Sequence, residues 1–248
     1  MAAVAAAAAS LTAAACINVT GSTCAVEQSD YHNLTFGVAA SDSLTSKTCI
    51  AFYKFSVGAQ ANLRVTLTSP GIQTFLQVSD STGVIRVNSV LSTALDTTTT
   101  VRMMLGAGGY QIFVVPYHEG QRAQYTLLAV TDTSAVGGCG AVWVTPGITT
   151  TQTISHADCT QGPGGSNSFT HVYGLLLRSG QSVVFSEHST SLAPGMTLTG
   201  PDGTEPSTAD SLGTTALLTT TVGSQGAYRL WVGSTSAGQV GSYTLQIQ

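Results

Sequence analysis

Residues able to do chemistry are scattered along this chain in patterns that match no common active site. The Gly-x-Ser-x-Gly elbow of an α/β serine hydrolase does not occur. Neither a phosphate-binding Gly-x-x-x-x-Gly-Lys-Ser/Thr loop nor a Gly-x-Gly-x-x-Gly turn opening a helix is present. The five histidines lack the His-Glu-x-x-His spacing of a zinc enzyme and are expected in exposed loops or at strand edges: His32, His118, His156, His171 and His188.

The carboxylates likewise predict no metal site. Asp80, Asp158 and Asp202 stand alone, and no Asp-x-Asp-x-Asp series supplies the six to eight oxygens that calcium takes. The sequence therefore predicts a protein without catalytic, cofactor-binding or metal-binding residues. Two alternatives stay open, namely a calcium site assembled from separate loops and an enzyme whose His, Ser and Asp converge from distant loops.

Four of the five cysteines take equivalent places in a sequence that repeats itself. Cys24 and Cys49 open the first copy, and Cys139 and Cys159 open the second. This placement predicts one disulfide in each copy, Cys24 to Cys49 and Cys139 to Cys159, each stabilising by roughly 3 to 4 kcal/mol and each implying an oxidising compartment. The alternative is five reduced, buried thiols.

The fifth cysteine, Cys16, follows an apolar run that ends in small residues, Ser10 to Ala15. This arrangement resembles the lipobox of bacterial lipoproteins, which implies a cleaved signal and a lipid anchor on Cys16. Ala13 stands where lipoproteins prefer Leu, and no Lys or Arg precedes Lys47. An uncleaved Ala-rich helix, too short to span a bilayer, is the alternative.

The elements that would position any site are strands, and they occur twice in the same order about 120 residues apart. Short runs rich in Val, Thr, Tyr and Leu alternate with Gly, Asp and Ser turns. We expect an all-β protein of two tandem antiparallel β-sandwich domains, jelly-roll-like, after a short Ala-rich segment. The expected ranges are 1–16 for the signal or anchor, 17–131 for the first domain and 138–248 for the second, with the linker short enough for the domains to touch.

Composition narrows the range of partners. Charged residues make up 8% of the 248 residues, the net charge is −4, and Lys and Arg together number eight. No basic patch is available to neutralise phosphates, so we expect no nucleic-acid binding and no electrostatic attraction to anionic lipid.

Two strands carry apolar residues on both faces. In the run from Tyr110 to Val115, Phe113 and Val115 face away from the other side chains, and Trp231 does so in the second copy. A sandwich strand normally has one solvated face, so these residues mark an expected interaction surface, with Tyr117 and Trp143 as weaker candidates. The alternative is that a loop or the neighbouring domain buries them.

Both copies resemble the bacterial pre-peptidase C-terminal domain. The resemblance rests on Tyr53 to Val57, the Asp80 to Gly83 turn and Tyr125-Thr126-Leu127, and on Gly226 to Val232 and Gly241 to Leu245 in the second copy. Gly174 and Leu175 depart from the pattern. The resemblance implies compact β-sandwiches that serve secretion, adhesion or substrate binding without catalytic residues.

These features together predict a non-catalytic, extracytoplasmic structural or binding protein. The leading hypothesis is a membrane-tethered accessory subunit, at the periplasm or cell surface, that contacts a larger membrane or envelope protein complex. The alternative is a carbohydrate-binding or adhesion module that places Trp or Tyr against the sugar rings of a glycan.

Overall fold

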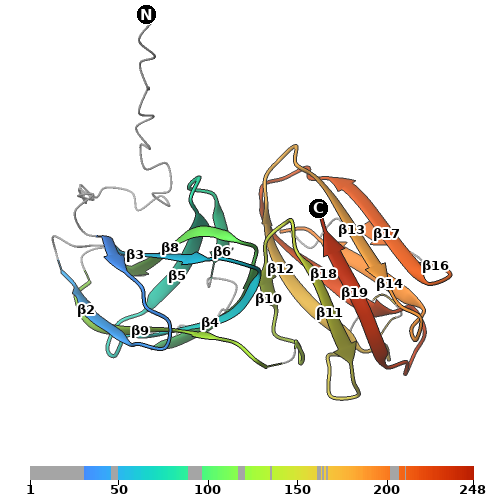
Figure 1. The fold of residues 1–248 in the computed structure, drawn as a ribbon, viewed down its shortest axis with the longest axis horizontal. Coiled ribbons are helices and arrows are strands. Elements are labelled where there is room, and N and C mark those ends of the chain that lie inside the picture. The colour runs from blue at the N-terminus through green and yellow to red at the C-terminus, as the bar shows by residue number, and fades with distance from the viewer. Residues whose placement is uncertain are drawn as a thin grey trace, which may run out of the picture.

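A computed structural model describes residues 31–45, 50–88, 97–116, 121–134, 136–160, 163, 165, 167–201, 207–209 and 211–248. Every regular element in these ranges is a β-strand, so the expected all-β fold is confirmed. Two stacks of sheets lie side by side, with the N-terminal half in one and the C-terminal half in the other (Figure 1).

The first stack has two facing layers. One is a five-stranded sheet in the order β1-β3-β8-β5-β6, in which β1 and β3 are parallel and the remaining pairs antiparallel. The other layer is formed by β7, β4, β9 and β2. The bounds are β1 Tyr31–Asn33, β2 Ala40–Leu44, β3 Ala51–Val57, β4 Ala61–Thr68, β5 Thr74–Asp80, β6 Ile85–Asn88, β7 Thr98–Leu105, β8 Gly108–Pro116 and β9 Ala123–Thr131.

The second stack repeats the two-layer plan. A five-stranded antiparallel sheet in the order β11-β19-β13-β17-β16 faces a layer made of β15, β14, β18 and β12. The bounds are β11 Thr149–Ile154, β12 Thr170–Leu177, β13 Ser182–His188, β14 Pro194–Thr199, β15 Ser207–Ala209, β16 Ser211–Leu212, β17 Thr215–Thr221, β18 Gly226–Ser234 and β19 Gly241–Ile247.

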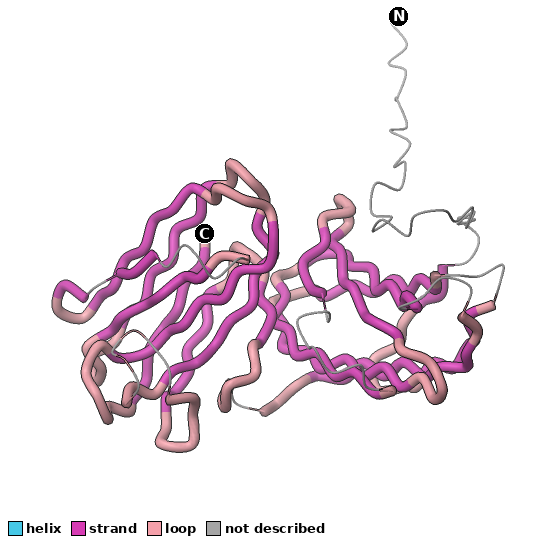
Figure 2. The backbone as a smooth tube through the Cα atoms, turned by 180° about the vertical axis from the view of Figure 1, so that it is seen from behind, coloured by secondary structure: helices cyan, strands magenta, loops and turns pink. Residues whose placement is uncertain are grey.

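A three-residue strand joins the two stacks. β10, Val142–Val144, pairs in parallel with β7 of the first stack and with β12 of the second. The described strands β15-β14-β18-β12-β10-β7-β4-β9-β2 therefore form one continuous nine-stranded sheet. Figure 2 shows from behind how the strands of the two stacks meet at this junction. The sequence predicted antiparallel sheets, but both pairings of β10 are parallel, so the long sheet is mixed at this junction.

The long sheet is covered on opposite faces in its two halves. Trp143 lies opposite Met103, and both belong to the core of the first stack. The next pair, Val144 and Met104, belongs to the core of the second stack. Since successive residues of a strand point to opposite faces, the first sheet of five packs on one face of the long sheet and the second on the other.

Candidate functional site

The junction between the stacks buries one of the aromatic residues expected on an outer surface. Trp143 is only 4% exposed and lies across from Gly174 of β12. A Cβ atom at residue 174 would lie 3.1 Å from two indole carbons of Trp143, so the glycine gives the indole room that a larger residue would narrow. The prediction that Trp143 marks an outer contact surface is therefore wrong, because the neighbouring sandwich covers it.

The remaining surface candidates fall on two faces. Phe113 is half-buried on the face of β8 that points away from the core, and its ring lies 5.1 Å from that of Phe52. Tyr31 continues this aromatic row at 5.0 Å from Phe52. Val115 shares the face but is only 8% exposed, so it offers little contact area.

Trp231 lies on β18, between Val172 of β12 and Thr197 of β14, on the face opposite Leu230. It is half-buried and outside both cores. Phe113 and Trp231 thus face away from the cores as expected. Tyr117 lies outside the described residues.

The two cysteines of the second copy form the expected disulfide. Cys139 and Cys159 are joined in a disulfide that closes a loop across the start of the second stack. Asp158, next to Cys159, accepts hydrogen bonds from the backbone and hydroxyl of Ser155 at 2.6 and 3.0 Å and so fixes the turn that carries the bridge. Cys16, Cys24 and Cys49 lie outside the described residues.

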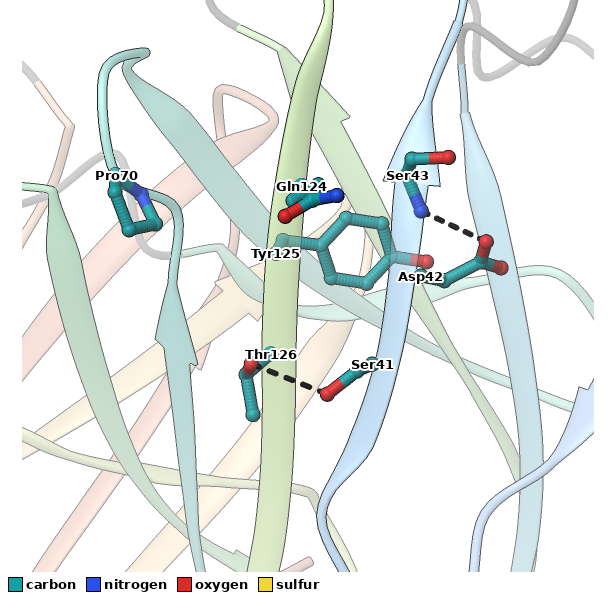
Figure 3. Close-up of a pocket in the computed structure, with 7 residues that line it drawn as sticks. All are labelled: Ser41, Asp42, Ser43, Pro70, Gln124, Tyr125 and Thr126. Atoms are coloured by element: carbon teal, nitrogen blue, oxygen red, sulfur yellow. Dashed lines mark hydrogen bonds between the residues drawn. The ribbon is translucent and has the colours of Figure 1, made fainter.

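A polar hollow of about 420 Å³ opens on the edge of the first stack, where β2 meets β9. Figure 3 shows its lining, with the Ser41 and Thr126 hydroxyls bonded to each other at 3.3 Å and the Tyr125 ring extending toward β2. The lining side chains carry hydroxyls, an amide and one carboxylate, with no cation: Ser41, Asp42, Ser43, Pro70, Gln124, Tyr125 and Thr126. Such a lining suits a neutral ligand rich in hydroxyl groups.

A second hollow of about 340 Å³ lies at the junction of the two stacks. The β5–β6 turn and the β7–β8 turn form one wall, and residues 145–147, after β10, form the other. Gln60 ties the walls together nearby, because its side-chain amide exchanges two hydrogen bonds with the backbone of Thr149, at 2.9 and 3.2 Å. The two halves of the chain are therefore hydrogen-bonded to each other close to the hollow.

Each stack contains a pair of tyrosines whose hydroxyls meet between the sheets. Tyr53 and Tyr125 are 2.8 Å apart in the first stack, and Tyr173 and Tyr243 are 2.6 Å apart in the second. Burial raises the pKa of all four hydroxyls, so they remain protonated and act as hydrogen-bond donors and acceptors at neutral pH.

The second stack extends its tyrosine pair with a buried histidine. The Nδ1 atom of His171 lies 2.7 Å from the Tyr243 hydroxyl, and Nε2 lies 3.3 Å from an Asp158 carboxylate oxygen. His171 is 0% exposed, so the expectation of an exposed histidine is wrong for this residue. Burial lowers its pKa, and the Asp158 charge offsets part of that effect.

The series Asp158, His171 and Tyr243 has the order of acid, imidazole and hydroxyl used in nucleophilic catalysis. All three side chains are buried, and neither described hollow includes them. The series links β12, β19 and the turn that precedes Cys159. Sequence reasoning missed it because the three residues come from different parts of the chain.

Glu187 is the most unusual buried group. It is 0% exposed, and neither carboxylate oxygen has a hydrogen-bond partner among the described residues. Burial raises its pKa to about 9, and the nearby backbone N–H of Gly195 offsets only part of that rise. The carboxyl group is therefore neutral at pH 7.

Comparison of the two copies shows which core positions Glu187 and His171 occupy. Glu187 lies opposite Leu245 of the closing strand, as Leu67 lies opposite Leu127 in the first stack. By the same comparison of pairing, His171 takes the position of Ala51. The second copy thus carries two ionisable residues where the first has Leu67 and Ala51.

The described residues hold no group of three or more His, Cys, Asp or Glu side chains placed to bind a metal ion. No helix long and apolar enough to cross a bilayer occurs in the described ranges.

Comparisons with known proteins give no family for this chain and only low-scoring structural neighbours. No protein family and no curated protein matches the sequence. A solved pre-peptidase C-terminal domain of collagenase from Bacillus anthracis is 15% identical, with a TM-score of 0.36, over 40% of this chain and 93% of that chain. The CBM22-1–CBM22-2 tandem domain of Paenibacillus barcinonensis Xyn10C is 11% identical, with a TM-score of 0.26, over 84% of this chain and 82% of that chain. The PBSX exported protein XepA is 12% identical, with a TM-score of 0.24, over 87% of this chain and 88% of that chain.

Likeness at these scores identifies no function. The described residues define two β-sandwiches that are fused through one shared sheet, with a disulfide in the second copy.

Proposed function

We propose that this protein is a non-catalytic, extracytoplasmic accessory subunit that holds a fixed spacing within a membrane or envelope protein complex. The observation that carries the proposal is the nine-stranded sheet that runs through both sandwiches. Two domains joined by a flexible linker would move independently, whereas β10 is hydrogen-bonded on both sides and its residues enter both cores. Such a unit suits a rigid brace.

The compartment follows from the disulfide. Bridges such as Cys139–Cys159 persist in oxidising environments and are rare in the cytosol. Attachment to the membrane would be through a lipid on Cys16. The aromatic row of Tyr31, Phe52 and Phe113, together with Trp231, supplies the proposed contact surface.

The test is native isolation from solubilised membranes, with mass spectrometry of the N-terminal peptide and of every co-purifying protein. The proposal predicts a lipidated Cys16 and a stoichiometric membrane-protein partner whose binding to the purified chain is weakened by Phe113→Gln or Trp231→Gln. Leu217→Gln is the matched control, because Leu217 is 60% exposed on the far sheet. An unmodified protein that purifies alone would contradict the proposal.

Carbohydrate binding is the second candidate, and the hollow between β2 and β9 favours it. Gln124 lines this hollow and is exposed, with no side-chain hydrogen bond among the described residues, so its amide is available to sugar hydroxyls. Binding of neutral oligosaccharides on a glycan array should fall with Gln124→Ala and persist with Gln246→Ala, an exposed glutamine of the second stack. No neutral glycan bound by the unaltered chain would remove this candidate.

A further inference from the structure

The hollow at the junction of the two stacks contains an arginine with unused hydrogen-bond donors. The Nε atom of Arg86 donates to an Asp80 carboxylate oxygen at 2.8 Å. Its two terminal amino groups have no hydrogen bond or ion pair among the described residues. The side chain is 23% exposed and lines the hollow. The edge of the guanidinium formed by these amino groups is therefore free.

The ion pair itself is rigidly placed. The other Asp80 oxygen accepts hydrogen bonds from Thr82 and from the backbone N–H of Val84, so the carboxylate is held by the β5–β6 turn. These contacts and Arg86 together lower the pKa of Asp80 despite the opposing effect of burial. The Asp80 oxygen that Arg86 does not contact thus already accepts three hydrogen bonds, which leaves it little capacity for a second bond from the guanidinium.

The opposite wall belongs to the second half of the chain. The Thr145 hydroxyl accepts a hydrogen bond from the Gly106 backbone N–H at 3.3 Å, which links the β7–β8 turn to the segment after β10. Ala107 and Gly108 are exposed in that turn, so little side-chain bulk separates a ligand from the backbone. Hollows between domains of this size are common positions for small-ligand sites.

We propose that this hollow binds a small ligand through a carboxylate group, which takes the free edge of Arg86 in a bidentate pair. The planar guanidinium matches a carboxylate with two parallel hydrogen bonds. Because Asp80 cancels the charge of Arg86, a singly charged carboxylate fits better than a doubly charged phosphate. Two kinds of small ligand carry such a carboxylate, namely an acidic sugar and a peptide with a free C-terminus.

The test is a titration of the ¹⁵N-labelled full chain with sodium glucuronate and with triglycine, followed by NMR at constant ionic strength. Glucose and triglycine amide are the neutral counterparts. We expect saturable shifts of the amide signals of residues 106–109 and 147 with at least one carboxylate probe and not with its neutral counterpart. A response to glucuronate alone identifies an acidic sugar, a response to triglycine alone identifies a peptide C-terminus, and responses to both support the carboxylate site itself.

Variants separate the guanidinium from general charge effects. Arg86→Gln should weaken binding about tenfold or more, the usual effect of losing a charge-assisted pair. Arg64→Gln removes the same charge from an exposed position on β4 and should leave binding unchanged. Ala107→Trp should block the hollow while the Asp80–Arg86 pair stays intact, which guards against an Arg86 variant that folds poorly.

Three results would overturn the proposal. The first is the absence of shifts around the hollow with both carboxylate probes. The second is an equal response to the neutral counterparts, and the third is an equal loss of binding in the Arg86 and Arg64 variants. None of these results bears on the accessory-subunit proposal, which depends on the shared sheet and on the outer aromatic residues.

Discussion

The buried carboxyl group of Glu187 makes the strongest quantitative prediction. Its free energy cost is set by the difference between its pKa in the folded chain, about 9, and its ordinary value of 4.5. Below pH 4.5 the group is protonated in both the folded and unfolded states and imposes no ionisation cost. Between pH 4.5 and pH 9 the unfolded state ionises while the folded state stays neutral, so stability falls as pH rises.

The size of the effect follows from about 1.36 kcal/mol per pH unit for one proton. At pH 7 the interval above 4.5 corresponds to roughly 3 kcal/mol, and at pH 9 to roughly 6 kcal/mol. Glu187→Leu, which places the residue of the first copy at this position, should remove this cost and also the burial of a polar group without partners.

The assay is urea unfolding at pH 5, 7 and 8.5 with the disulfide intact. Glu187→Leu should be more stable than the unaltered chain by roughly 3 kcal/mol at pH 7, with a larger gain at pH 8.5 and a smaller one at pH 5. Glu187→Gln is the matched control, because it keeps the shape and polarity but cannot ionise, and it should show the same loss of pH dependence. Parallel pH profiles for all three proteins would refute the assignment of a buried neutral acid.

The remaining predictions concern the junction, the disulfide and the buried histidine. Gly174→Ala should destabilise the chain by about 1–3 kcal/mol, because its Cβ would press on the Trp143 indole, and Trp143→Phe should relieve part of that cost in a double-mutant cycle of denaturant unfolding. Replacing Cys139 and Cys159 by Ser should lower the unfolding free energy by roughly 3 kcal/mol, and reductant should then have no further effect on this bridge. Burial lowers the pKa of His171 in the folded state, so below the unfolded pKa of about 6.5 the unfolded state binds a proton that the folded state does not, and stability falls as pH falls. His171→Leu should reduce this loss of stability, as measured by thermal unfolding from pH 7 to pH 4.

Much of the fold could be predicted because strand signals are local. Alternation in runs such as Leu63 to Leu67 and the turn at Asp80 to Gly83 are readable without tertiary information, and both appear in the structure as β4 and as the β5–β6 turn. The Cys139–Cys159 bridge could be predicted from the equivalent places of cysteines in the repeat. The strands and turns depend on short-range sequence, and the bridge depends on comparing the two copies.

The junction could not be predicted in the same way. Val142–Val144 is only three residues long, too short to reveal pairing partners, and its parallel bonds join strands that are distant in sequence. The apolar character of both faces of β12 was the available signal, because that strand is buried on both faces where the sheets overlap. The same overlap explains why Trp143 is buried while Trp231, two strands away, remains half-exposed.

Divergence between the two copies gives the best guide to what each half does. In the first stack the tyrosine pair ends at Asp42, which lies 3.4 Å from His32 at an edge where both side chains are at least one-third exposed. In the second stack the tyrosine pair ends at His171 and Asp158, whose side chains are 0% and 6% exposed. These two residues do not occupy the positions of His32 and Asp42, since His171 pairs as Ala51 does in the first copy. The polar residues beside the tyrosine pair are thus buried in the second copy and accessible in the first, beside a hollow lined with hydroxyls and an amide. We therefore expect ligand contacts to concentrate on the first stack and on the junction.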